Sequence, residues 1–221
     1  MTTELVVLDM AGTTVADDGL VVRAFTAAID AVGVPGERYP DMLEYVADTM
    51  GQSKITVFRA LLDDETLAQQ ANSAFEAAYG DLVRGGACTP IDGAEDVIRG
   101  LRESGVKVAF TTGFAPATQQ TILDALGWRD LADLALAPGD GVRGRPFPDL
   151  VLTAALRLEI TDVRQVAVVG DTASDVLCGL RAGASVVAGV LTGAGRREDL
   201  LEATHVLESV RDLPTVLEGA K

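Results

Sequence analysis

Three aspartates stand where two apolar runs of the sequence end. Asp9 directly follows Leu5–Leu8, while Asp171 and Asp175 follow Val166–Val169. A carboxylate at the end of a buried strand is well placed to act as a nucleophile in an α/β fold. Carboxylates brought together repel one another unless a cation lies between them, and Mg²⁺ accepts such ligands. These residues predict a nucleophile, Asp9, in a magnesium site that Asp171 and Asp175 complete.

Donors for an anion follow two further runs. Thr112 comes after Val106–Phe110, and Arg145 comes after Leu134–Leu136. The hydroxyl of Thr112, the guanidinium of Arg145 and the backbone N–H groups after Asp9 are suited to hold phosphoryl oxygens. Polar groups in this order at successive strand ends favour a phosphoryl-transfer site over unrelated turn residues.

Position 11 departs from what a phosphate-ester hydrolase needs. The turn after the first strand reads Asp9-Met10-Ala11-Gly12-Thr13-Thr14. A second aspartate at position 11 would protonate a leaving alcohol, and general acid catalysis of that kind is typically worth about 10²–10⁴-fold. With Ala11 in its place, either the enzyme is impaired or its leaving group is not an alcohol.

The elements that position these residues alternate along the chain. Short apolar runs separated by helical patterns are typical of a parallel sheet covered on both faces. The expected strands are Leu5–Leu8, Val106–Phe110, Leu134–Leu136, Val166–Val169 and Val186–Leu191. The expected helices are Gly93–Ser104, Pro116–Leu126, Pro148–Leu158 and Ser174–Ala182. We therefore predict an α/β fold in which the candidate residues meet at the carboxyl ends of the strands.

The segment from Asp18 to Arg84 breaks that alternation. It is patterned as consecutive helices without a strand, at Leu20–Val32, Pro40–Thr49, Ser53–Leu62 and Glu65–Val83. A helical insert placed right after the first strand and its turn predicts a cap over the site. Val15–Gly19 and Gly85–Pro90 have the composition of hinges. The expected division is a core of residues 1–17 and 86–221 and a cap of residues 18–85.

Composition and charge limit the class of protein. The 221 residues carry a formal net charge of −15, which argues against nucleic-acid and anionic-membrane partners. The apolar runs are too short to span a membrane, and Met1–Glu4 begins no signal-like stretch. Cys88 and Cys178 are expected to be free thiols in a reducing compartment. We expect a cytoplasmic protein that binds a small anionic phosphonate or phosphate.

The order of the motifs resembles the haloacid dehalogenase superfamily along nearly the whole chain. The motifs are Asp9-x-Ala11-Gly12-Thr13-Thr14, Thr112-Gly113, Gly144-Arg145-Pro146-x-Pro148 and Gly170-Asp171-Thr172-x-x-Asp175. The resemblance implies a Rossmann-like parallel sheet core with an inserted all-α cap of the C1 type. It adds Thr13 to the catalytic set. It also implies that Mg²⁺ binds Asp9, the backbone carbonyl of Ala11 and Asp171, with Asp175 acting indirectly.

Within the superfamily, Ala11 and Arg145 resemble the phosphonatase (phosphonoacetaldehyde hydrolase) branch, since most relatives carry aspartate and lysine there. The cap segment Met50-Gly51-Gln52-Ser53-Lys54 resembles the phosphonatase segment whose lysine forms a Schiff base with the substrate aldehyde. A lysine at a helix N-terminus in a closing cleft has a lowered pKa, because the helix dipole and desolvation both disfavour its charge. The resemblance implies substrate contacts at Ala11, Gly12, Met50, Gly51, Gly113 and Arg145.

An imine on Lys54 would explain why position 11 carries alanine and no acid. Cleavage of a carbon–phosphorus bond expels a carbanion, and an iminium on Lys54 accepts those electrons so that an enamine leaves instead. Asp9 would attack phosphorus and form an aspartyl-phosphate that water hydrolyses, while Mg²⁺ and Arg145 hold the phosphonate. We therefore predict a Mg²⁺-dependent hydrolase of phosphonoacetaldehyde or a closely related small carbonyl phosphonate.

Other positions depart from the phosphonatase pattern, and two alternatives stay open. Val57, Phe114, Met10 and Leu20 stand where histidine, tyrosine, tryptophan and cysteine are expected. One alternative is a phosphomonoesterase for a small phosphorylated metabolite, with Lys54 merely contacting the substrate. The other is a catalytically weak protein that binds phosphorylated metabolites. The resemblance also implies a homodimer.

Overall fold

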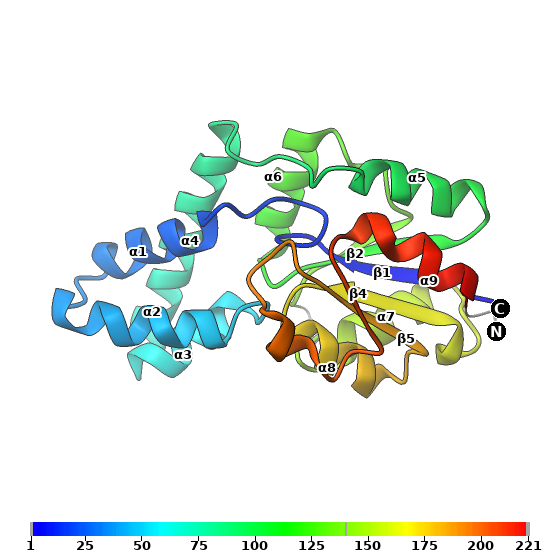
Figure 1. The fold of residues 1–221 in the computed structure, drawn as a ribbon. Helices are drawn as coiled ribbons and strands as arrows, with labels where there is room; N and C mark the ends of the chain where they lie inside the picture. The colour runs from blue at the N-terminus through cyan, green and yellow to red at the C-terminus, as the bar shows by residue number, and fades with distance from the viewer. Residues whose placement is uncertain (1, 140, 220–221) are drawn as a thin grey trace.

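The core of the protein is a single parallel sheet. The computed structural model describes residues 2–139 and 141–219, so residues 1, 140, 220 and 221 of the expected core lie outside the described residues. The strands run in the order β3-β2-β1-β4-β5-β6, and every neighbouring pair is parallel (Figure 1). Their bounds are β1 (Leu5–Asp9), β2 (Lys107–Thr111), β3 (Leu134–Leu136), β4 (Val166–Gly170), β5 (Val186–Val190) and β6 (His205–Leu207).

Helices cover both faces of this sheet (Figure 1). They are α5 (Ala94–Glu103), α6 (Pro116–Leu126), α7 (Asp149–Arg157), α8 (Ala173–Ala182) and α9 (Leu213–Gly219). Side chains of β1 alternate between two apolar clusters: Val6 and Leu8 belong to the cluster that includes α5 and α6, whereas Leu5 and Val7 belong to that of α7 and α8. The predicted α/β fold is confirmed.

A helical cap follows the first strand, as predicted. Its helices are α1 (Leu20–Ala31), α2 (Tyr39–Asp48), α3 (Lys54–Leu62) and α4 (Glu65–Arg84), with a short 3₁₀ turn at Gly36–Arg38. Phe58 stacks on Phe25 with ring centroids 5.0 Å apart and meets the edge of Phe75 at 6.2 Å. These stacked rings form the apolar centre of the cap.

Two connections join the cap to the core. They lie side by side, because Ala16 N–H donates to Thr89 O at 2.9 Å and Ile91 N–H donates to Thr14 O at 2.9 Å. The division of the chain at residues 17/18 and 85/86 stays a prediction.

The register of the sheet brings the polar strand ends together. Asp9 lies opposite Thr111 of β2, and Leu8 lies opposite Val169 of β4. The three central strands therefore end at nearly the same level, and the residues that follow them emerge side by side at one edge. Burial explains why such short apolar runs suffice as strands, since all five residues of β1 and of β4 are buried.

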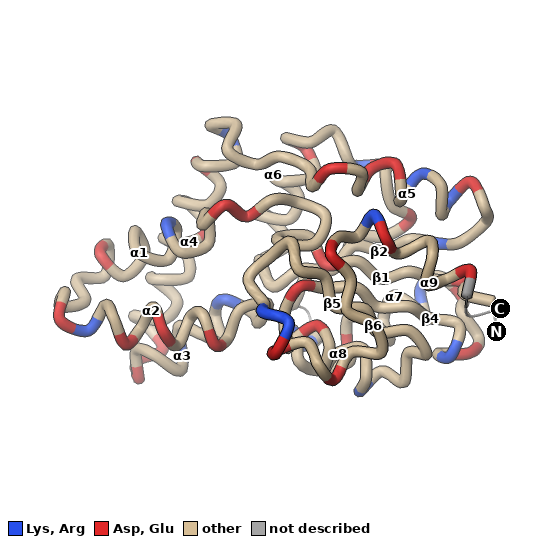
Figure 2. The backbone as a smooth tube through the Cα atoms, viewed as in Figure 1, with Lys and Arg blue, Asp and Glu red and all other residues tan. Residues whose placement is uncertain are grey.

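Charge and the cysteines complete the description. Acidic and basic residues are interspersed on helices of both the core and the cap (Figure 2). Cys88 and Cys178 are free, buried thiols, as expected. No helix of the described residues has the length and apolar character needed to cross a membrane.

The cap is closed onto the core through a segment without bulky side chains. The backbone N–H of Lys54 donates to Gly113 O at 3.3 Å. A Cβ atom at Gly113 would lie 2.5 Å from Gln52 O and 2.8 Å from Gly51 O. On the cap side, a Cβ atom at Gly51 would lie 2.4 Å from the hydroxyl oxygen of Thr172. The absence of side chains at both glycines therefore lets the start of α3 approach the core.

Replacing Gly113 by alanine is expected to push the cap away from the core. The atoms in the way are backbone, so overpacking of about 1–3 kcal/mol should make hydrogen exchange of the Lys54 amide roughly tenfold faster or more. Gly100→Ala is the matched control, because a Cβ atom there meets nothing within 4 Å. Unchanged exchange at Lys54 in Gly113→Ala, measured by mass spectrometry, would contradict this account of closure.

Candidate active site

Most of the site residues expected from the sequence line one cavity between the core and the cap. The core contributes Asp9, Ala11, Thr112, Gly113, Arg145 and Asp171. The cap contributes Met50, Gly51 and Lys54. The cavity volume that the centre of a water molecule can occupy is about 30 Å³. This is room for about two water molecules. The closed cap therefore leaves a small, nearly filled site.

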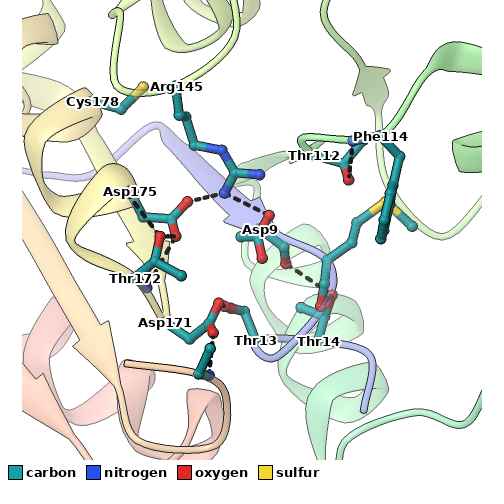
Figure 3. Close-up of polar contacts among 12 residues, drawn as sticks. Asp9, Thr13, Thr14, Thr112, Phe114, Arg145, Asp171, Thr172, Asp175 and Cys178 are labelled. Atoms are coloured by element: carbon teal, nitrogen blue, oxygen red, sulfur yellow. Dashed lines mark hydrogen bonds and ion pairs between the residues drawn. The ribbon is translucent and has the colours of Figure 1, made fainter. Parts of the chain in front are cut away.

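The three predicted carboxylates gather at the carboxyl edge of the sheet (Figure 3). One oxygen each from Asp9, Asp171 and Asp175 lies within 4.8 Å of the others, and all three residues are buried. Burial, and then the charge of Asp9, raise the pKa of Asp171 to about 7. A cation placed among these carboxylates would relieve both effects.

Arg145 lies between two of the carboxylates (Figure 3). Its Nη1 is 2.6 Å from Asp9 Oδ1 and also forms an ion pair with Asp175 Oδ1. The sequence interpretation assigned Arg145 to a phosphoryl group and did not foresee these two pairs. Among the buried side-chain nitrogen and oxygen atoms in the described part of the chain, only Arg145 Nε and the Tyr79 hydroxyl are without a hydrogen-bond partner. The guanidinium of Arg145 thus keeps one buried donor unpaired.

Hydrogen bonds hold the carboxylates of Asp171 and Asp175 in place. Asp171 Oδ2 accepts from Ala194 N–H at 2.7 Å, and its Oδ1 accepts from the Thr13 hydroxyl at 3.3 Å. Asp175 Oδ2 accepts from the Thr172 hydroxyl at 2.5 Å and from Thr172 N–H at 3.1 Å, and the second bond belongs to the capping box that begins α8. Because each carboxylate keeps a fixed orientation, the cluster is preorganised.

Gly12 and Thr13 act within the turn that follows Asp9. Gly12 has a φ of +88°, and a Cβ atom there would lie 2.4 Å from Asp171 Oδ2. Its N–H donates to Val15 O at 2.7 Å. In this closed form, Gly12 therefore supports the turn and the carboxylate, and the expected backbone contact to a substrate is left to Ala11, which lines the cavity.

Lys54 begins α3 and is buried, as its predicted role requires. Its Nζ lies 5.5 Å from the ring centroid of Phe114 and 6.0 Å from that of Phe75. Desolvation and then the positive charge of Arg145 lower the pKa of Lys54 to about 8, against the opposing charges of Asp17, Asp9 and Glu76. The sequence interpretation credited the helix dipole in place of Arg145. Ser53 is the N-cap residue, but its side chain forms no capping hydrogen bond.

Some cavity residues were missed from the sequence. Asp17, Val21, Thr172 and Ala194 also line the cavity. Asp17 lies in an expected hinge, where aspartate is common for turn geometry alone, so its type carried little signal. Ala194 follows β5, and the rule that strand ends meet would have indicated that loop.

The donor set fits the expected metal. Mg²⁺ prefers oxygen ligands and is usually held by one or two carboxylates with waters. The buried oxygens of Asp9 and Asp171, together with the raised pKa of Asp171, match that requirement. Asp175 is paired with Arg145 and Thr172, which suits the indirect role expected for it. The Ala11 carbonyl as a ligand stays a prediction.

Phosphonoacetaldehyde hydrolases are among the known proteins with sequences similar to this chain. Phosphonoacetaldehyde hydrolases from Bacillus cereus (strain B4264) and Bordetella pertussis (strain Tohama I) are each 30% identical to it. The matches cover 95% and 97% of this chain and 84% and 91% of those proteins.

Solved structures share the fold across the whole chain. A phosphonoacetaldehyde hydrolase-like protein from Oleispira antarctica has a TM-score of 0.83 at 25% identity, covering 99% of this chain and 92% of that one. A predicted phosphoglycolate phosphatase from Haemophilus somnus 129pt has a TM-score of 0.81 at 18% identity, covering 98% of both chains. A family model described as haloacid dehalogenase-like hydrolase matches residues 3–183. With that match and the aspartate cluster at the carboxyl edge of its sheet, the chain belongs to the haloacid dehalogenase-like hydrolases.

Proposed function

We propose that this hydrolase cleaves the carbon–phosphorus bond of phosphonoacetaldehyde or of a closely related small carbonyl phosphonate. The observation that carries the proposal is that Lys54 and Asp9 line the same closed cavity, whose wall also includes Ala11. The Asp9 carboxylate can attack phosphorus, while the buried amine of Lys54 can attack a carbonyl carbon. The similarity to phosphonoacetaldehyde hydrolases supports the same substrate class.

In the proposed reaction, Lys54 and Asp9 act on neighbouring atoms of the substrate. Lys54 condenses with the aldehyde to an iminium, and Arg145 and Thr112 hold the phosphonate oxygens. The Asp9 carboxylate then attacks phosphorus, and the electron pair of the carbon–phosphorus bond moves into the iminium to give an enamine. Water hydrolyses the aspartyl-phosphate, while the enamine takes up a proton and is hydrolysed to acetaldehyde. Ala11 suffices because no alcohol leaves.

The metal would have a limited part in this scheme. When bound by Asp9, Asp171 and the Ala11 carbonyl, Mg²⁺ would neutralise charge on the phosphonate. Arg145, which lines the cavity, would then orient the phosphonate through its guanidinium.

The second candidate activity is hydrolysis of phosphate monoesters. A predicted phosphatase from Haemophilus somnus has the same fold. Ala11 speaks against this activity, since the position that would protonate a leaving alcohol carries a methyl group. The burial of Lys54 also goes beyond what a simple contact to an anion requires, because a surface lysine would suffice for that. A cytoplasmic location and a homodimer stay predictions.

The direct test replaces Lys54 by arginine, which keeps the charge and cannot form an imine. Release of phosphate and acetaldehyde from phosphonoacetaldehyde is expected to fall by more than about 10³-fold, or about 4 kcal/mol of transition-state stabilisation. Lys107→Arg is the matched control and should keep wild-type rates, since Lys107 Nζ donates to Leu158 O at 2.6 Å outside the cavity. Turnover of phosphate esters but not of the phosphonate would favour the phosphomonoesterase.

The pH dependence follows from the lowered pKa of Lys54. The free amine is the nucleophile, so acetylation of Lys54 by acetic anhydride, which needs no proton carrier, should become about tenfold faster per pH unit below pH 8 and level off above it. Acetylation rates between pH 6 and 9.5, followed by mass spectrometry of the peptide that contains Lys54, check this. A profile that is flat from pH 6 to 8, or one still rising at pH 9.5, would be inconsistent with a lysine of pKa about 8.

A further inference from the structure

The imine cycle needs a proton carrier beside Lys54. An amine adds to an aldehyde to give a carbinolamine, whose hydroxyl oxygen must be protonated before it leaves as water. The buried neighbours Val57 and Phe114 have no proton to give. Some other group on the wall of the cavity has to supply that step.

The carboxyl group of Asp17 is placed for the task. Asp17 lies in the connection between β1 and α1 and lines the same cavity as Lys54. Of the acidic groups whose charge acts on Lys54, Asp17 has the largest effect, ahead of Asp9 and Glu76. One of its oxygens accepts from Val21 N–H at 3.2 Å, which fixes the carboxyl group at the start of α1.

The other titratable groups near Lys54 are either engaged elsewhere, as Asp171 is with Thr13 and Ala194, or lie outside the cavity lining. Asp9 is paired with Arg145 at 2.6 Å and is assigned to phosphorus. Glu76 accepts hydrogen bonds from the Thr118 hydroxyl and from Ala115 N–H, which tie α4 to the start of α6. The hydroxyl of Tyr79 is buried, and its ring packs against Phe114 with centroids 4.4 Å apart. Neither Glu76 nor Tyr79 belongs to the cavity lining.

We propose that Asp17 carries the proton in formation and hydrolysis of the Lys54 imine, an assignment that rests on the proposed function. Protonated Asp17 gives its proton to the carbinolamine hydroxyl, the carbon–oxygen bond breaks, and water leaves with that electron pair. The nitrogen lone pair forms the carbon–nitrogen double bond of the iminium, whose positive charge then faces the Asp17 carboxylate. In hydrolysis of the product imine the same steps run in reverse.

The surroundings of Asp17 favour this use of its proton. Burial raises the pKa of Asp17, against the lowering effects of the Val21 hydrogen bond and of the Lys54 charge. A carboxyl group with a raised pKa keeps a larger protonated fraction near neutral pH, as a general acid requires. Asp18, its exposed neighbour in the sequence, lacks this environment.

Asp17→Asn is the principal variant, because its side-chain oxygen can still accept the hydrogen bond from Val21. Steady-state release of phosphate from phosphonoacetaldehyde is expected to fall about 10²–10³-fold in kcat. The inhibition constant of inorganic phosphate should stay within about twofold of wild type, since Asp17 has no part in holding the phosphonate. Asp18→Asn is the matched control and should keep the wild-type kcat.

The sign of the effect separates proton transfer from mere electrostatics. Removal of the Asp17 charge lowers the pKa of Lys54 further, because that charge opposes the effect of desolvation. A role limited to setting the pKa of Lys54 therefore predicts faster amine attack in Asp17→Asn at pH 7, whereas a proton carrier predicts slower turnover. A rate equal to or above wild type would overturn the assignment and leave the proposed function intact.

A second variant tests the assignment independently of folding losses. Asp17→Ala opens space for a small carboxylic acid, and added formate should raise its kcat in proportion to formate concentration while leaving wild type unchanged. Absence of any formate effect, with phosphate inhibition intact, would count against Asp17. If wild-type protein released no phosphate from phosphonoacetaldehyde, the proposed function itself would fail, and that result is distinct from a failure of Asp17 alone.

Discussion

The side-chain amine of Lys54 is buried because groups from both the cap and the core surround it. Lys54 and Phe75 belong to the cap, whereas Phe114 and Arg145 belong to the core. Only when these parts meet does the amine lose water and sit near the positive charge of Arg145, which together lower its pKa to about 8. An open cap would return the amine to water and to an ordinary lysine pKa. We therefore expect the pKa of Lys54 to depend on closure of the cap.

The core, by contrast, buries an excess of negative charge. Asp9, Asp171 and Asp175 are buried within a short distance of one another, and Arg145 compensates part of their charge. A divalent cation would compensate the rest and free Arg145 for an anionic substrate. Ala11 fits the proposed reaction, in which a fourth carboxylate would add to the repulsion without a leaving alcohol to protonate. In the proposed reaction, Lys54 and Ala11 therefore serve the same chemistry.

Much of the arrangement could be predicted from the sequence, because its signals are local. Apolar runs ending in Asp9 and Asp171 identify buried strands and the edge where they meet, and Lys54 was placed at a helix start. The strand β6 was missed because it begins with exposed His205 and its other two residues are only partly buried. No apolar run marks such an edge strand.

What could not be predicted depends on contacts between distant segments. The pairing of Arg145 with Asp9 and Asp175 joins three loops, and nothing in the type of these residues distinguishes it from contact with a phosphoryl group. Asp17 has the composition of a hinge, and its place on the cavity wall follows only from how the cap folds back over the core. The same holds for Glu76, which faces α6 across the junction.

The central claim is that Lys54 becomes covalently bound to the carbon skeleton of the substrate. Reduction with borohydride during turnover of phosphonoacetaldehyde, followed by mass spectrometry of the peptide that contains Lys54, tests it most directly. We expect an N-ethyl group on Lys54, which is the reduced imine of acetaldehyde, together with loss of activity. Release of phosphate at wild-type rates with an unmodified Lys54 would contradict the account.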